Sequence, residues 1–130
     1  MSWHTIKPRK SDKIFSLYIR TRDGFKCQVP ICGRTAAMGY QMQASHWFGR
    51  AVEPCRFDEN NVITLCAGCH RRLHGKGNAE YDELMEQRLG KKRYNLLLLR
   101  GYRERKKRDD VMDEKYCQKL LDDLEITKKI

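Results

Sequence analysis

Apolar residues in the first half of the chain follow two different periods. Over 11–22 they recur every three to four positions, which predicts a helix with Ser11 as its N-cap and Gly24 as its stop. Over 40–48 apolar and polar residues alternate, which predicts a strand with His46 near its end. The first half of the chain is therefore expected to combine a helix with a strand.

The second half is mostly helical in pattern. Residues 62–65 form a short β-branched run, typical of a strand, and 69–74 should open a helix that Gly75 and Gly77 end. Helical spacing then continues to the end of the chain, with a break at Gly90. The later helical segments are predicted over 79–89, 94–99 and 111–124. The pattern as a whole predicts a small α+β domain with a helical extension.

Composition limits how this domain can be stabilised. The chain has 130 residues, of which 40% are hydrophobic and 34% charged, so it is long enough for one domain but poor in core residues. A bound metal would help such a domain to fold. No apolar run approaches the roughly 20 residues of a membrane span, and the N-terminus lacks the apolar stretch of a signal peptide. We therefore expect no membrane association and a reducing, cytoplasmic location, where paired cysteines bind metal more often than they form disulfides.

The charge balance suggests a polyanionic partner. The formal net charge is +10, which favours DNA or RNA, although a merely soluble basic protein would have the same balance. Much of the positive charge lies over 100–108, where only Glu104 opposes it.

The six cysteines divide into pairs and single residues. Cys66 and Cys69 have the two-residue spacing of a zinc knuckle, and Cys27 and Cys32 have a looser spacing that is still usual for ligand pairs. We predict that these four thiols bind one structural Zn²⁺; the alternative, reduced core cysteines, would not explain the pairing. The two single residues, Cys55 and Cys117, are read as ordinary free cysteines.

Histidines follow the second cysteine pair directly. His70 and His74 are four residues apart, so on a helix they would share one face and could bind a single divalent metal through two imidazoles. His46 lies on the predicted strand upstream. A surface or core residue is the simpler reading for His4.

The combination of His46, Asn61 and Leu65-Cys66-x2-Cys69-His70-x3-His74 resembles the HNH, or ββα-metal, nuclease motif. The resemblance covers about residues 27–74 and implies a ββα core with a zinc site made of four cysteines. It further implies that His46 is the general base, that Asn61 orients it, and that His70 and His74 bind a catalytic Mg²⁺, Mn²⁺ or other divalent metal. The implied activity is hydrolysis of DNA phosphodiester bonds.

A closer resemblance is to the NinG/Rap group of phage recombination endonucleases. It rests on four segments that span most of residues 11–90. These are Phe15-Ser16-Leu17-Tyr18-Ile19-Arg20-Thr21-Arg22-Asp23, Gln43-Ala44-Ser45-His46-Trp47-Phe48, Arg56-Phe57-Asp58-Glu59-Asn60-Asn61-Val62 and Gly77-Asn78-Ala79-Glu80-Tyr81. The resemblance implies branched recombination intermediates as substrates and, for a phage-encoded protein, the bacterial host cytosol as location.

One position departs from the HNH pattern. Ser45 stands directly before His46, where these enzymes usually have an Asp or His that binds the metal. His70 also stands where some relatives carry asparagine. The metal would then have only His70 and His74 as firm protein ligands, with water, substrate phosphate or an acidic residue of 53–59 completing the set.

Three functions stay open at this point. The first is the endonuclease, divided into a basic arm over 1–10, a zinc-stapled HNH nuclease domain over 11–78 and a basic helical extension over 79–130. The second, favoured by Ser45, is a non-catalytic zinc-stabilised nucleic-acid-binding module. The third is a partner-binding protein that forms a homodimer through its C-terminal helices, with 96–99 as a permissive apolar run. Candidate DNA contacts are Arg50, Arg71, Arg72, Arg105, Lys106 and Lys107, and Trp47 and Phe48 are expected in the core rather than stacked on bases.

Overall fold

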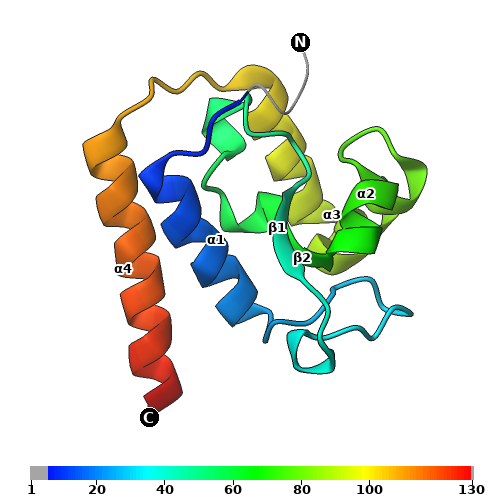
Figure 1. The fold of residues 1–130 in the computed structure, drawn as a ribbon. Helices are drawn as coiled ribbons and strands as arrows, with labels where there is room; N and C mark the ends of the chain where they lie inside the picture. Colours follow the sequence, from blue (N-terminus) through cyan, green and yellow to red (C-terminus); the bar gives the residue numbers. More distant parts are fainter. Residues whose placement is uncertain (1–5, 130) are drawn as a thin grey trace.

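The computed structural model describes residues 6–129, so His4 and half of the predicted basic arm lie outside the described residues. Four helices and two strands form a mixed α/β fold (Figure 1). In chain order they are α1 (Lys10–Arg22), β1 (Met42–His46), β2 (Val62–Cys66), α2 (Ala67–Leu73), α3 (Ala79–Arg103) and α4 (Asp110–Lys129). Short 3-10 turns lie at η2 (Ala36–Met38), η3 (Glu53–Cys55) and η4 (Glu59–Asn61).

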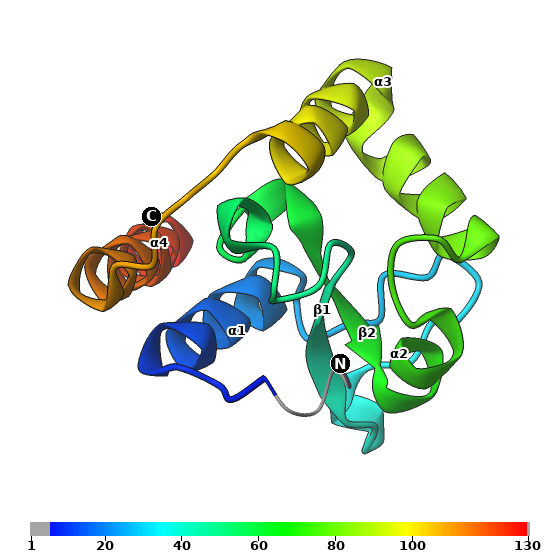
Figure 2. The same ribbon diagram turned by 90° about the horizontal axis from the view of Figure 1, so that it is seen from above.

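The two strands form an antiparallel sheet at the centre of the molecule. Met42 pairs with Cys66 and His46 with Val62, so the sheet covers both strands from end to end. Helix α1 lies on one side, while α2 and α3 lie on the other (Figure 2). Because both faces are covered, every residue of β2 is buried.

Two apolar clusters fill the space on either side of the sheet. The larger cluster joins the sheet to α2 and α3 and contains Trp47 and Phe48, which confirms that these aromatics belong to the core. The smaller cluster joins α1 to α4 through Phe15, Ile19 and Leu121. Helix α4 therefore packs along α1 rather than standing alone (Figure 1). The division into a nuclease domain and a helical extension stays a prediction.

Helix α1 begins earlier than its sequence pattern predicted. Arg9, not Ser11, is the N-cap, and the Asp12 carboxylate accepts a hydrogen bond from the Arg9 backbone N–H at 2.6 Å. Ser11 lies inside the first turn and is buried. The prediction was wrong because an acidic side chain in the first turn can satisfy a free N–H as well as a serine can. Gly24 does follow the helix end, with φ of 67°.

The predicted break in the third helix is confirmed. Gly90 has φ of 78° and ψ of 158°, so two helical pieces meet there at a kink. After the kink, Gly101 lies against the Phe48 ring, where an added Cβ would come within 2.2 Å of a ring carbon. Glycine at this position lets the second piece of α3 approach the core closely.

None of the helices in the described part of the chain is long and apolar enough to cross a membrane.

Candidate functional site

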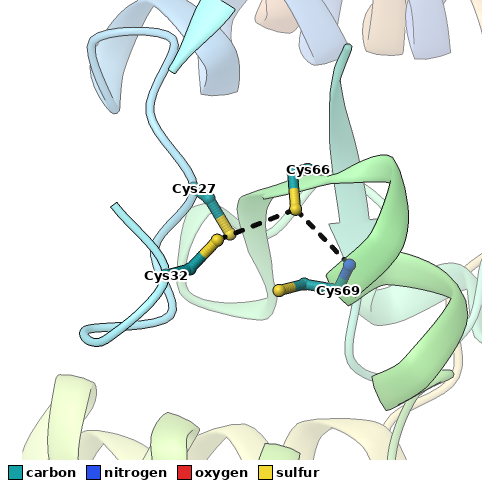
Figure 3. Close-up of side chains that lie close together, drawn as sticks. All are labelled: Cys27, Cys32, Cys66 and Cys69. Carbon is teal, nitrogen blue, oxygen red and sulfur yellow. Dashed lines mark hydrogen bonds between the residues drawn. The ribbon is translucent and has the colours of Figure 1, made fainter. Parts of the chain in front are cut away.

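The four paired cysteines meet at one point beside the sheet. All four Sγ atoms lie within 4.8 Å of one another, although they come from a loop, the end of β2 and the first turn of α2 (Figure 3). The Sγ atoms of Cys32 and Cys66 are 3.9 Å apart. Tetrahedral zinc with Zn–S bonds of about 2.3 Å requires sulfurs about 3.8 Å apart. The cluster of Cys27, Cys32, Cys66 and Cys69 can therefore hold a structural metal such as zinc.

Backbone and side-chain donors lie close to the sulfurs of Cys66 and Cys69. The Cys69 N–H donates to the Cys66 Sγ at 3.4 Å, and the guanidinium of Arg72 lies 3.7 Å from the Cys69 Sγ. Burial alone would raise the pKa of the Cys66 thiol, but the Cys69 hydrogen bond and neighbouring thiols outweigh it and lower that pKa to about 6. Burial instead raises the pKa of the Cys27 and Cys69 thiols. Because metal ligands must be thiolates, Cys66 is the member of the cluster best prepared to bind a metal.

The other two cysteines are free and lie apart from the cluster, as predicted. Cys55 packs in the larger apolar cluster and Cys117 in the smaller one, both fully buried.

A groove of about 990 Å³ separates α1 from α2, with β1 as its floor. All three candidate catalytic histidines line it. The other lining residues come from the N-terminal segment, α1, β1, the loop after β1 and the start of α2: Ile6, Pro8, Asp12, Lys13, Ser16, Arg20, Gln43, Ala44, Gly49, Arg50, Ala51, Ala67 and Arg71.

His46 is held in a single orientation at the end of β1. Its Nε2 donates to the backbone carbonyl of Arg56 at 2.9 Å, and its ring lies 6.5 Å from the Phe15 ring. Because a carbonyl only accepts, Nε2 carries the proton of the neutral imidazole and Nδ1 keeps the free lone pair. Burial lowers the pKa of His46 to about 4, so the ring is neutral near pH 7.

Asn61 ties the loop after His46 to the second strand. Its Oδ1 accepts from the Phe48 N–H at 2.8 Å, and its Nδ2 donates to the carbonyls of Phe48 at 2.9 Å and Cys55 at 3.1 Å. The side chain is fully buried, so these bonds are shielded from water. Asn61 therefore fixes the backbone beside His46 without touching its ring.

His70 and His74 reach the groove by different means. Helix α2 begins at Ala67, two residues before its predicted start, and ends at Leu73, one residue before its predicted end. His74 therefore lies just beyond the helix. His74 has φ of 64° and ψ of −64°, and the Gly75 N–H donates to the Leu73 carbonyl at 2.8 Å. This is a γ-turn, which costs a non-glycine residue on the order of 1–3 kcal/mol. The strain lies at a residue proposed to bind metal.

Gln43 orients the other histidine. The Nδ1 of His70 lies 2.6 Å from the Oε1 of Gln43 on β1. This contact places the ring proton on Nδ1 and leaves Nε2 free. Within residues 6–129, only the four cysteines bring three or more potential ligand atoms together, so His70 and His74 form at most a two-ligand site by themselves.

Ser45 turns away from the groove. Its Oγ is 2.8 Å from the Tyr81 hydroxyl of α3, and the side chain is fully buried. It is therefore not available as a metal ligand.

Comparison with known proteins adds one match that covers most of the chain. A family model described as bacteriophage lambda NinG protein matches residues 4–125. The chain belongs to this family. No curated protein and no solved structure matches it.

The structure places the basic residues of this NinG-family chain in three settings. Arg50 and Arg71 line the histidine groove. Arg72 is instead paired with Glu80 and with the Cys69 sulfur. The remaining candidates, Arg105, Lys106 and Lys107, line a separate groove of about 1100 Å³ between α3, η4 and α4.

Sequence reasoning missed several residues that build the NinG-family site. The carboxylate of Asp12 and the guanidinium of Arg56 form a buried ion pair that joins α1 to the loop before β2. Arg56 also supplies the carbonyl that holds His46. Gln43 and Tyr81, which contact His70 and Ser45, were missed too. Gln43, Arg56 and Tyr81 stand in segments that carry the NinG/Rap resemblance, but each residue acts through a partner distant in sequence, so its role could not be read from the segment.

Proposed function

We propose that this NinG-family chain is a metal-dependent DNA endonuclease of the HNH type, with β1, β2 and α2 as its ββα-metal core. The observation that carries the proposal is His46: a neutral imidazole, oriented through Nε2, lining the same groove as His70, His74, Arg50 and Arg71. A general base needs this combination of a fixed ring and a free nitrogen.

The chain's own residues divide the reaction between them. His46 accepts a proton at Nδ1 from the attacking water while the water oxygen bonds to phosphorus. The bond from phosphorus to the 3′ oxygen breaks, and that oxygen takes a proton from solvent, leaving 5′-phosphate and 3′-hydroxyl ends. Asn61 keeps the loop behind His46 in place, and Arg56 keeps the ring from turning. Arg50 and Arg71 are positioned to contact backbone phosphates.

His70 and His74 would hold the divalent metal. When bound, Mg²⁺ or Mn²⁺ would offset negative charge on the phosphate and the departing oxygen. Gln43 supports this role because it fixes the His70 ring with Nε2 free. Water and substrate phosphate would complete the ligand set, so we expect metal affinity to rise when DNA is bound.

A non-catalytic DNA-binding module is the second candidate. The burial of Ser45 against Tyr81 favours it, because the strand then offers no metal ligand beside His46. It would use the same groove and the same arginines.

Plasmid incubated with the protein and Mg²⁺ or Mn²⁺ separates the two. We expect the wild type to nick or cut it, and His46→Ala to lose roughly 100-fold or more in rate, the usual scale for a general base. Melting temperature and zinc content serve as controls for folding, because His46 is no ligand of the cysteine cluster. His70→Ala should regain part of its activity at higher metal concentration. Cleavage by His46→Ala at the wild-type rate would contradict the mechanism.

A further inference from the structure

Helix α1 presents a row of polar side chains to the groove. Lys13, Ser16 and Arg20 line it, at spacings of three and four residues that place them on one side of the helix. The neighbouring residues Phe15 and Ile19 face the smaller apolar cluster instead. One face of α1 therefore builds the core, while another forms a wall of the groove opposite α2.

The two cations in this row are available to a ligand. Lys13 is exposed, and neither Lys13 nor Arg20 forms a salt bridge with any residue of 6–129. The Nε of Arg20 donates to the Ser16 carbonyl at 3.2 Å, and its guanidinium lies 5.8 Å from the centre of the Phe25 ring. These contacts hold the side chain in place but do not neutralise its charge.

The groove as a whole is positive. Its one carboxylate, on Asp12, is bound by the buried guanidinium of Arg56, with Arg50 3.8 Å away. Lys13, Arg20, Arg50 and Arg71 then leave an excess of positive charge above a floor that contains His46. Such a groove is complementary to a nucleic-acid backbone rather than to a neutral or cationic ligand.

We infer that α1 is the second wall of a DNA-binding groove, in which Lys13 and Arg20 bind phosphates of the strand that passes over His46. Seven residues of helix separate these two cations by about 10 Å, so they reach different phosphates. Arg71 on α2 contacts the same strand from the other side. The inference rests on the proposed function for the nature of the ligand and adds α1 to the binding surface.

The test is a binding measurement without cleavage. Full-length Lys13→Gln/Arg20→Gln and wild type are compared by fluorescence anisotropy on labelled duplex DNA over a range of salt, with no added divalent metal. Two lost phosphate contacts should flatten the slope of log K against log salt by about 1.8 and weaken binding roughly ten- to thirtyfold at physiological salt. The matched control is Lys115→Gln/Lys119→Gln on α4, which removes the same charge away from the groove and should keep the wild-type slope.

The outcomes separate the inference from the nuclease proposal. An unchanged slope in Lys13→Gln/Arg20→Gln, or an equal change in the α4 control, would overturn the role of α1 even if the protein cuts DNA. Tight, salt-dependent binding that needs Lys13 and Arg20 would support the groove even if Mg²⁺ and Mn²⁺ give no cleavage. Failure of the wild type to bind DNA would overturn the inference as well.

Discussion

The residues that shape this site most are buried and polar. Asp12, Ser45, Arg56 and Asn61 are all at most 8% exposed, and each has a specific partner. Burial alone would raise the pKa of Asp12, but hydrogen bonds from Arg56 and from the Arg9 backbone keep it below its ordinary value. Such groups are costly to leave unpaired, by about 3–5 kcal/mol for one half of a buried ion pair. Through these contacts, α1, the loop before β2 and the His46 ring are held in fixed positions relative to one another.

His46 should make both stability and activity depend on acid pH. Its pKa is about 4 in the folded protein and about 6.5 when unfolded, so the unfolded state takes up a proton first as pH falls. Its stabilising contribution is complete above pH 6.5 and is lost as pH falls from 6.5 towards 4, on the order of 3 kcal/mol. Urea unfolding of wild type and His46→Gln at several pH values should show a smaller loss in the variant. Cleavage should likewise persist below pH 6 and fall near pH 4 to 5; loss with a midpoint at 6.5 would contradict the lowered pKa.

At the scale of elements, periodicity and spacing predicted much of the order but little of the packing. The strands at 42–46 and 62–66 and the break at Gly90 follow from local pattern, since β-branched runs and glycine act through their own backbone. The N-cap at Arg9 and the γ-turn at His74 were not predicted, because Asp12 takes the capping role expected of Ser11 and helical spacing gives no sign of where a helix ends in a γ-turn. The meeting of Cys27 and Cys32 with Cys66 and Cys69 was predictable, since cysteine pairs at these spacings are typical of one zinc site, whose ligands must lie close together.

The cysteine cluster joins the loop that carries Cys27 and Cys32 to the end of β2 and the start of α2, so its loss should unfold the domain. A structural zinc contributes on the order of 10–16 kcal/mol, as much as the whole stability of a typical domain. Cys66→Ser/Cys69→Ser should therefore lose the bound zinc, about one per chain, and its cooperative melting transition. Cys117→Ala, outside the cluster, should keep the full zinc content by metal analysis while melting somewhat lower. Equal zinc in both variants would show that the cluster does not bind it.

At the scale of the whole molecule, two grooves with no residue in common carry basic side chains. One contains the histidines and the other contains Arg105, Lys106 and Lys107. Two separate basic surfaces suit DNA with more than one duplex arm, which is the substrate class that we predict from the resemblance to the NinG/Rap group. The possible homodimer stays a prediction: Leu96 and Leu99 are exposed, whereas Leu97 is buried within the chain.

We predict that four-way junctions are cut in preference to linear duplex. We expect this preference to come from contacts between a second duplex arm and the groove that contains Arg105, Lys106 and Lys107. The variant to use is Arg105→Gln/Lys107→Gln, because Lys106 pairs with buried Asp113 at 3.0 Å and its removal would destabilise α4. This variant should lose most of its preference for junctions while cutting linear duplex at nearly the wild-type rate. Equal cleavage of both substrates by the wild type would leave a general nuclease without branch specificity.

The packing of α4 on α1 has a consequence for synthesis of the chain. Phe15, Tyr18 and Ile19 emerge from the ribosome well before Cys117 and Leu121, which pack against them from α4. Until α4 is made, only Phe57 and Val62 of this cluster can cover the apolar side of α1, and contacts so distant in sequence are slow to form. The second cysteine pair and its histidines are complete much sooner. Ribosome-bound chains that stop before α4 should thus bind zinc at an early stage but need protection by a chaperone until α4 docks on α1.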